Sequence, residues 1–111
     1  MPIITLRKGR VQHKYKNVHI TTHGIRFDSK AEAVYYANLL IRVRDGSIVV
    51  FTRQVPFHLP GGTRYVCDFL EFHADGTVHF VDVKGFETPA FIKNKKQVEA
   101  LYAPIEIEVV K

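Results

Sequence analysis

Three charged residues on two neighbouring stretches of the chain could do chemistry together. Asp68 is separated by thirteen residues from Asp82, and Lys84 follows two positions later. Two carboxylates can hold a divalent cation, and an ammonium group beside them can hold the water molecule that the cation activates, which suits the hydrolysis of a phosphate ester. That chemistry requires the three side chains to meet, so it depends on how their strands pair.

Both stretches have the composition of β-strands. Residues 64–73 and 77–84 are rich in aromatic and β-branched residues and contain neither proline nor glycine. Between them, Ala74-Asp75-Gly76 suits a three-residue hairpin loop with its glycine in the left-handed conformation. The sequence therefore predicts a β-hairpin.

The residues that close this loop decide which way the charged side chains point. If His73 and Thr77 close it, Asp68 lies directly opposite Asp82, and both share one face with Lys84. The same face would carry the apolar residues Val66, Leu70, Phe72, Val78 and Phe80. Like charges opposed on a sheet are destabilising, and a shared proton or a bound cation relieves the repulsion. If the loop closes one residue differently, the two aspartates lie on opposite faces of the hairpin and both are solvated. The hairpin alone leaves both registers open.

A third carboxylate comes from a predicted helix. Ser29 suits the N-cap and Glu32 the third helical position of a capping box, so we expect a helix over residues 30–44, ended by Gly46. Glu32 then heads an inward stripe that continues through Tyr36, Leu39 or Leu40, and Val43. Two roles stay open for Glu32: a ligand that reaches a site on the sheet, or a capping residue with no further role.

The other elements complete a mixed α/β pattern. We expect a short hairpin over residues 18–21 and 25–27, an extended run over 49–55, a further extended piece over 57–59, a helix from Pro89 to about Tyr102, and a final strand over 105–110. The second helix is expected to face the sheet with Phe91, Val98 and Leu101. This order of elements predicts a mixed central β-sheet flanked by helices.

Positive charge is concentrated in two places. The 111-residue chain has a net charge of +5, and no acidic residue precedes Asp28. We therefore expect a basic, flexible arm over residues 1–16 before a single domain over residues 17–111, and such an arm attracts phosphates without reading bases. A solvated terminus that only aids solubility is the alternative. The predicted nucleic-acid-binding residues are Arg7, Lys8, Arg10, Lys14 and Lys16 in the arm, and Lys93, Lys95 and Lys96 in the second helix.

The composition limits which metals and which nucleophiles a site in this protein could use. Cys67 is the only cysteine, which excludes an internal disulfide and a thiolate zinc cluster, and its place on the face opposite Asp68 favours a core residue over a nucleophile. Carboxylate oxygens suit Mg²⁺ or Mn²⁺ rather than zinc. Neither an apolar run of membrane-spanning length nor a secretory leader is visible, so a soluble cytoplasmic protein is expected.

The order of the charged residues resembles a known nuclease family. Asp68, then Asp82-Val83-Lys84, with Glu32 on a preceding helix, resembles the PD-(D/E)XK nuclease superfamily. Four blocks in the same order are similar to small phage-encoded members of that superfamily, namely residues 27–33, 54–57, 68–69 and 82–86. The resemblance covers roughly residue 14 to the C-terminus.

The resemblance implies a fold, a site and an activity. It implies a restriction-endonuclease-like core in which Glu32, Asp68, Asp82 and the Val83 carbonyl bind Mg²⁺ or Mn²⁺, while Lys84 assists the attacking water or the transition state. Because small phage members resemble Holliday junction resolvases, it further implies a homodimeric DNA endonuclease acting on four-way or branched DNA in phage recombination, in the host cytoplasm. A general nuclease for DNA degradation or end processing, and a non-catalytic nucleic-acid-binding module, remain as alternatives.

The sequence departs from the family pattern at two positions. Cys67 stands where the family name has proline, and position 82 has Asp rather than Glu. The shorter side chain leaves the metal geometry open. Gln54 and Gln97 occupy positions at which the sequence assigns no definite role.

Overall fold

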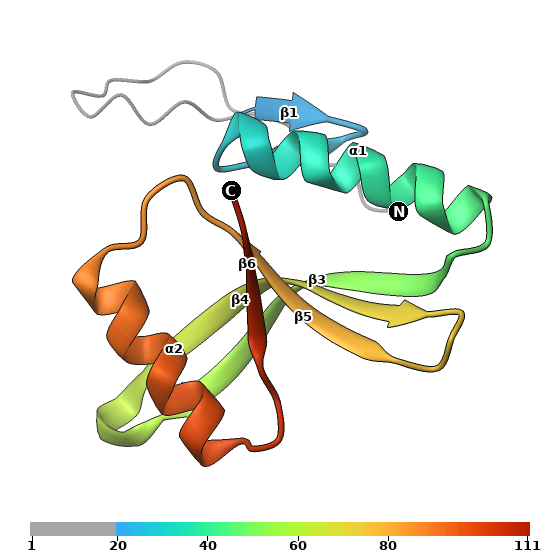
Figure 1. Ribbon diagram of the computed structural model, residues 1–111. Helices are drawn as coiled ribbons and strands as arrows, with labels where there is room; N and C mark the ends of the chain where they lie inside the picture. Colours follow the sequence, from blue (N-terminus) through green and yellow to red (C-terminus); the bar gives the residue numbers. More distant parts are fainter. Residues whose placement is uncertain (1–19) are drawn as a thin grey trace.

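The computed structural model describes residues 20–111, so the predicted basic arm over residues 1–16 lies outside the described residues. The elements follow in the order β1 (Ile20–Thr22), β2 (Ile25–Phe27), α1 (Lys30–Arg44), β3 (Ile48–Leu59), a 3₁₀ turn (Pro60–Gly62), β4 (Thr63–His73), β5 (Val78–Val83), α2 (Pro89–Leu101) and β6 (Ile107–Val110) (Figure 1). Within this part of the chain, no helix is long and apolar enough to cross a membrane.

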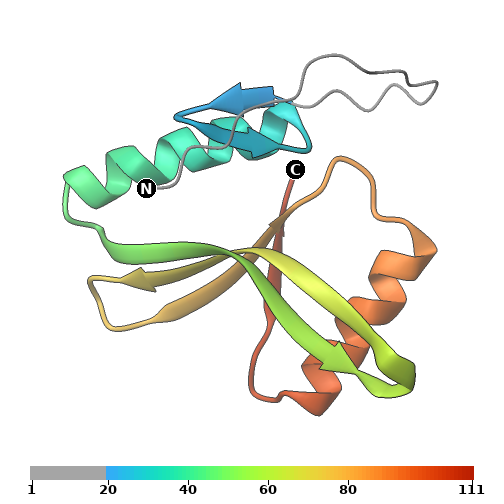
Figure 2. The same ribbon diagram turned by 180° about the vertical axis from the view of Figure 1, so that it is seen from behind.

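The central sheet has four strands in the order β3-β4-β5-β6. The β3–β4 and β4–β5 pairs are antiparallel, and the β5–β6 pair is parallel. The protein is therefore the mixed α/β fold that the sequence predicts, and it is compatible with a restriction-endonuclease-like core. The β1–β2 hairpin lies beside α1 at one end of the molecule, and α2 lies toward the other end (Figures 1 and 2).

Helix α1 begins and ends where its capping residues predict. The Ser29 hydroxyl accepts a hydrogen bond from the Glu32 N–H at 3.1 Å, and Gly46, with a φ of +90°, follows the C-terminal turn. The helix buries the side chains of Glu32, Ala33, Tyr36 and Leu39. The predicted inward stripe is thus confirmed at Glu32, Tyr36 and Leu39.

Helix α2 is also capped as predicted, but its inward face differs at one position. The Thr88 hydroxyl accepts a hydrogen bond from the Phe91 N–H at 3.1 Å, and Phe91 and Val98 are buried. Leu101 is 54% exposed, so its predicted place in the core is wrong. Tyr102 at the C-cap packs against the core instead, because the helix ends at that turn and the chain direction changes.

The hairpin register is the one that opposes the two aspartates. The His73 N–H donates to the Thr77 carbonyl oxygen at 2.9 Å, and Gly76 in the loop has a φ of +91°. The ladder pairs are Phe72–Val78, Glu71–His79, Leu70–Phe80 and Phe69–Val81. The next pair in this register joins Asp68 and Asp82, so the structure has one of the two registers that the hairpin sequence left open. Asp82 is completely buried, whereas Phe72 and Val78 near the loop are 40% and 50% exposed, so the aspartates lie at the buried end of the hairpin.

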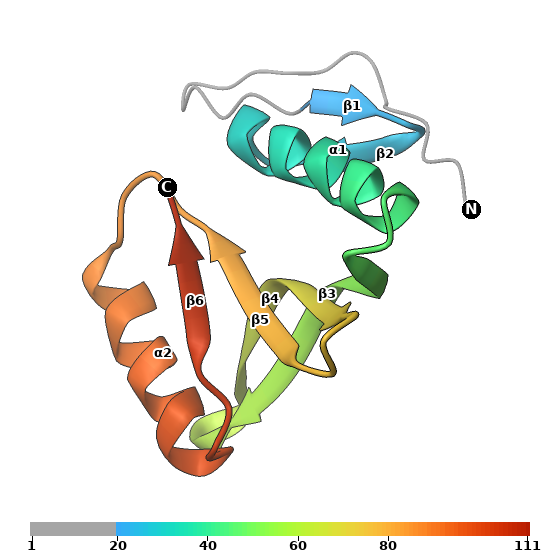
Figure 3. The same ribbon diagram turned by 45° about the vertical axis from the view of Figure 1, so that its right-hand side comes forward.

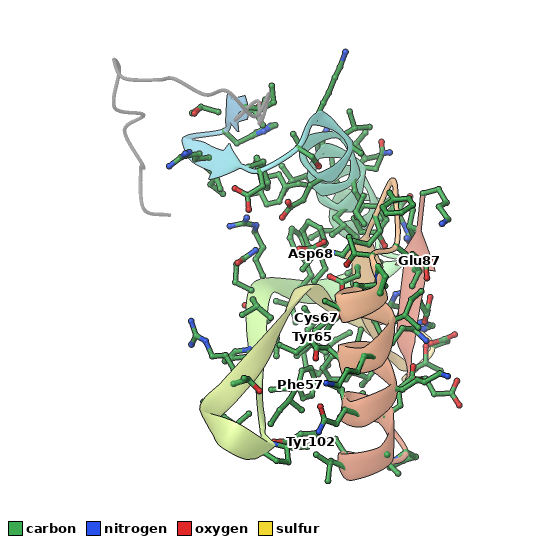
Figure 4. The ribbon with its side chains drawn as sticks, turned by 90° about the vertical axis from the view of Figure 1, so that its left-hand side faces the viewer. Phe57, Tyr65, Cys67, Asp68, Glu87 and Tyr102 are labelled. Carbon is green, nitrogen blue, oxygen red and sulfur yellow. The ribbon has the colours of Figure 1, made fainter. Side chains whose placement is uncertain are left out.

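Two hydrophobic cores divide the sheet, and β4 passes from one to the other at Asp68. The core under α1 contains Ile25, Phe27, Ala33, Tyr36, Leu39, Ile48, Phe69, Val81 and Val83. The core under α2 contains Phe57, Leu59, Tyr65, Cys67, Phe91, Val98 and Ile107. Phe69 and Cys67 belong to different cores although residues two apart on a flat strand share a face, so the sheet turns between them. Figure 4 shows Cys67 and other core residues in a row beside α2, and Asp68 lies at the end of this row that is nearer to α1.

Strand β3 makes the same turn through a left-handed residue. Gln54 has a φ of +56°, a conformation that is uncommon for residues other than glycine. It is flanked in the β3–β4 ladder by the pairs Arg53–Phe69 and Val55–Cys67. The ladder continues on both sides of Gln54, so β3 is one strand from residue 48 to 59, where the sequence predicts two separate extended pieces.

The left-handed conformation at Gln54 leads to a stability prediction. We expect Gln54→Gly to be at least as stable as the wild type, because glycine adopts a positive φ without a Cβ clash. We expect Gln54→Val to lose about 1–2 kcal/mol, because a β-branched residue is strained there. Urea unfolding of the three proteins measures both effects. Equal stability of the glycine and valine variants would contradict a left-handed residue at this position.

Candidate active site

Asp68 and Asp82 lie where β4 and β5 separate, and each binds the backbone of the other strand. Asp82 Oδ1 accepts a hydrogen bond from the Asp68 N–H at 2.9 Å. Asp68 Oδ2 accepts one from the Val83 N–H, also at 2.9 Å. Each carboxylate thus accepts a backbone hydrogen bond that a carbonyl of the opposite strand would accept in a regular ladder. This reciprocal pair of hydrogen bonds holds the two side chains next to each other.

The second oxygen of Asp82 is buried and has no partner. Asp82 is 0% exposed, and Oδ2 makes no hydrogen bond within the described residues. Burial raises the pKa of Asp82 and also that of Asp68, although the Val83 N–H and the charge of Lys84 oppose the rise at Asp68. Because an unpartnered buried carboxylate oxygen costs free energy, a bound cation would stabilise this arrangement.

Lys84 approaches the aspartates from the side of α2. Its Nζ lies 5.0 Å from the centre of the Phe91 ring, which is cation–π geometry, and its backbone N–H donates to the Val110 carbonyl oxygen at 2.8 Å. Its positive charge lowers the pKa of both Asp68 and Asp82. Lys84 is therefore held within electrostatic reach of both carboxylates.

Glu32 approaches the same region from the first turn of α1, together with Arg53. The Glu32 side chain is buried, and its Oε2 lies 3.5 Å from Arg53 Nη2. Burial raises the pKa of Glu32 to about 7, and the charge of Asp68 contributes to this rise while that of Arg53 opposes it. Glu32 and Asp68 therefore belong to one electrostatic group. The Glu32 carboxylate faces Arg53, so capping is not all that this residue does.

The raised pKa of Glu32 predicts how stability depends on pH. The folded-state pKa is about 7 and the ordinary value 4.5, so the wild type is stabilised below pH 4.5 and loses that stability as pH rises through 7. Glu32→Gln does not titrate. We expect its advantage in free energy of unfolding over the wild type to grow between pH 5 and pH 8, by up to about 3 kcal/mol.

Urea unfolding at both pH values without divalent cations measures this difference. Glu106→Gln is a matched control, because Glu106 is exposed in the connection from α2 to β6. A difference between Glu32→Gln and the wild type that stays constant with pH would contradict the burial of an ionisable carboxylate at Glu32.

The four side chains predicted to act together are gathered around Asp68, but not as a finished metal site. Among residues 20–111, no three His, Cys, Asp or Glu side chains converge closely enough to hold a metal ion as they stand. One oxygen each of Glu32 and Asp82 is buried and unpartnered, and these oxygens would have to turn toward a cation. With Asp68 and the Val83 carbonyl they form an all-oxygen donor set, which fits Mg²⁺ or Mn²⁺. The residues present are thus suited to a divalent metal once Glu32 leaves its ion pair.

Two charged residues near these carboxylates were not predicted as part of the site. Arg53 pairs with Glu32, and its guanidinium carbon lies 4.6 Å from the centre of the Phe27 ring. Asp28 raises the pKa of Glu32 and of Asp68 through its charge. No spacing pattern in the sequence links residue 53 to residue 32, so the ion pair could be found only in the folded structure.

The predicted basic residues of α2 divide into two groups. A surface groove is lined by Pro89, Ile92, Lys93, Lys96 and Gln97. Lys95 instead pairs with Glu99, with Nζ 3.0 Å from Oε2. Two of the three lysines therefore flank an open groove. The five basic residues predicted in the arm, from Arg7 to Lys16, lie outside the described residues.

Cys67 is a core residue, as the sequence predicts. It is completely buried, and its Sγ lies 3.5 Å from the Val81 carbonyl oxygen. Burial raises the pKa of the thiol to about 12, which keeps it protonated near neutral pH. Cys67 thus fills the core under α2 beside the aspartates.

Fold and site together define a mixed α/β protein in which one buried and one half-buried carboxylate lie beside a lysine. The chain belongs to the family described as "Protein of unknown function (DUF1064)", which it matches over residues 12–111. No curated protein and no solved structure matches the chain.

Proposed function

We propose that this protein is a metal-dependent DNA endonuclease that hydrolyses phosphodiester bonds, with a preference for four-way or branched DNA. One observation carries the proposal. Asp68 and Asp82 oppose each other where β4 and β5 separate, one buried oxygen of Asp82 is unpartnered, and Lys84 is held beside them. This arrangement costs stability in the absence of a cation, and it suits metal-assisted hydrolysis when one is bound.

Each residue has a distinct part in the proposed reaction. A divalent cation held by Glu32, Asp68, Asp82 and the Val83 carbonyl would supply Lewis acidity, which makes a water molecule more acidic and offsets negative charge on the phosphate. The backbone hydrogen bonds of the two aspartates fix one oxygen of each carboxylate in place and hold the two side chains next to each other. The Lys84 ammonium can donate hydrogen bonds to the attacking water or to a non-bridging phosphate oxygen.

Positive charge supports DNA as the substrate. Carboxylates alone would repel a polyanion, whereas the net charge of +5 and the groove flanked by Lys93 and Lys96 favour phosphate contacts. The preference for junctions follows from the resemblance of the sequence to small phage-encoded endonucleases. Because a junction is cut on two strands, we propose a homodimer with two sites, acting in the cytoplasm.

A cleavage assay on two substrates of equal sequence tests the proposal. Four-way junction DNA and linear duplex DNA are incubated with the protein and Mg²⁺, and we expect the junction to be cut at least about tenfold faster, at symmetric positions. Equal cutting of both, or ladders that start at duplex ends, would indicate a general DNA nuclease instead. Binding without cleavage at any Mg²⁺ or Mn²⁺ concentration would indicate a non-catalytic nucleic-acid-binding module.

A further inference from the structure

Arg53 carries a guanidinium group whose hydrogen-bonding capacity is poorly used. Its Nη2 lies 3.5 Å from Glu32 Oε2, which is long for a hydrogen bond. Its Nε is buried and has no partner within residues 20–111. Arginine presents five N–H donors in a planar fork that matches the oxygens of a phosphate. Charge attraction therefore holds the Arg53 guanidinium near the Glu32 carboxylate, while its N–H donors remain available to another ligand.

Glu32 Oε2 is the atom for which Arg53 and a metal would compete. This oxygen is buried and makes no hydrogen bond in the described part of the chain, and its neighbour is the Arg53 guanidinium. A divalent cation that used the same oxygen would lie close to the guanidinium, and the two positive charges would repel each other. Metal binding at Glu32 therefore requires Arg53 to move away.

The backbone keeps a released Arg53 side chain close to the site. Arg53 is paired with Phe69 in the β3–β4 ladder, and Phe69 directly follows Asp68. The Phe27 ring lies under the guanidinium, and the left-handed Gln54 fixes the direction in which β3 leaves this point. A guanidinium displaced from Glu32 stays tethered beside the carboxylates, where the reacting phosphate would lie.

We propose that Arg53 is a phosphate-binding residue held in reserve by Glu32: a divalent cation bound to the carboxylates releases its guanidinium, which then binds a phosphate of the DNA backbone. The inference rests on the proposed function, because it takes the carboxylates as a metal site and DNA as the ligand. It couples the two binding events, since the same side chain that opposes the metal in free protein binds DNA once the metal is present.

The first test measures metal binding without DNA. Mn²⁺ is titrated by calorimetry into the wild type, Arg53→Met, Arg53→Lys and the control Arg64→Met, whose arginine is exposed at the far end of β4. Methionine keeps an unbranched apolar stem over Phe27 but removes the charge. We expect the Kd for Mn²⁺ to fall about tenfold in Arg53→Met and to stay unchanged in Arg64→Met and Arg53→Lys. An unchanged Kd in Arg53→Met would overturn the competition between Arg53 and the metal.

The second test measures DNA binding with and without metal. Binding of four-way junction DNA is followed by fluorescence anisotropy in a Lys84→Met background, in which cleavage is expected to be about 10²–10³-fold slower and therefore negligible during the measurement. We expect Mn²⁺ to strengthen DNA binding in this background. When Arg53→Met is added, we expect the DNA affinity with Mn²⁺ to be about tenfold lower than with Arg53 present, and the affinity without metal to be unchanged. Arg53→Lys should lose part of the gain, because a lysine keeps the charge without the planar fork. An equal loss with and without Mn²⁺, or no loss, would overturn the proposal.

Failure of this inference can be told apart from failure of the proposed function. If the wild type binds Mn²⁺ and cuts DNA while Arg53→Met behaves like the wild type in both binding assays, only the role of Arg53 is wrong. If the wild type binds no Mn²⁺ and cuts no DNA, the metal site itself is wrong. Circular dichroism melting checks that each variant is folded. Should Arg53→Met unfold, Arg53→Lys still tests the proposal, because it keeps the counter-charge at Glu32 and lacks the bidentate phosphate contact.

Discussion

Replacing Asp82 with asparagine is expected to abolish Mg²⁺-dependent DNA cleavage and, at the same time, to stabilise the protein. Asparagine keeps an oxygen that can accept the Asp68 N–H, but it removes a completely buried charge opposite a second carboxylate. We expect cleavage to fall about a thousandfold or more, because a metal ligand is lost. We expect the free energy of unfolding at pH 8 to rise by about 1 kcal/mol. Removing a buried negative charge next to a second carboxylate stabilises the fold by more than the lost attraction to Lys84 costs.

Cleavage of a labelled junction and urea unfolding without divalent cations measure the two effects in one pair of proteins. Glu106→Gln serves as the control, since it removes an exposed carboxylate and should change neither quantity. Mg²⁺ should raise the melting temperature of the wild type and leave that of Asp82→Asn unchanged, because a ligand stabilises only the fold that binds it. An Asp82→Asn variant that is less stable and cuts normally would assign Asp82 a purely structural role.

Replacing Lys84 with methionine is expected to separate catalysis from metal binding. Methionine keeps the apolar stem that lies toward the Phe91 ring, but it removes the ammonium group that acts on Asp68 and Asp82. We expect the cleavage rate to fall about 10²–10³-fold, as for the loss of one group that stabilises charge in the transition state. Mn²⁺ binding should be kept or strengthened, because a nearby positive charge has been removed.

Single-turnover cleavage and Mn²⁺ calorimetry on the same preparation measure these two quantities. Lys111→Met is a matched control, because Lys111 is an exposed lysine whose Nζ lies 3.0 Å from Glu87 Oε2 (Figure 4 labels Glu87). It should cut DNA like the wild type. Loss of metal binding together with cleavage in Lys84→Met would mean that Lys84 supports the fold of the site rather than the chemistry.

Local patterns in the sequence were sufficient to predict the elements that carry the site. The Ser29 cap and Gly46 predict both ends of α1 correctly, and the loop ending in Gly76 predicts the hairpin. The hairpin alone left two registers open, and the structure has the one in which Asp68 opposes Asp82. Both are short-range effects: a cap satisfies the amides of its own helix, and a hairpin loop fixes the pairing of the strands that it joins. The predicted convergence of Glu32 with the aspartates needed more than local patterns, and it came from the family resemblance.

The features that escaped prediction depend on contacts between distant parts of the chain. The left-handed conformation of Gln54 follows from the turn of the sheet between two cores, and glutamine carries no local preference for it. The Glu32–Arg53 ion pair joins α1 to β3, so no periodicity could connect its members. Leu101 fits the helical stripe of α2 but lies exposed, because Tyr102 packs where the helix ends.

The arrangement of the two cores explains why the carboxylates lie together. Figure 3 shows α1 and the β1–β2 hairpin at the end of the molecule toward which β5 and β6 point, while α2 runs beside β6. Asp68 lies where β4 leaves one core for the other, and Asp82 lies between Val81 and Val83 of the core under α1. Side chains from α1 and from the sheet can therefore approach the same point. The β4–β5 ladder separates there, and carboxylates accept the hydrogen bonds that backbone carbonyls would otherwise accept.

Cleavage of a four-way DNA junction by the wild type and by Asp82→Asn, across a range of Mg²⁺ concentrations, tests most directly whether this carboxylate group is a hydrolytic metal site. We predict products with the wild type that appear as Mg²⁺ is added and stop when EDTA removes it, and none with the equally folded Asp82→Asn variant. Cutting by Asp82→Asn at the wild-type rate, or no cutting by the wild type with either Mg²⁺ or Mn²⁺, would contradict a catalytic role for these residues.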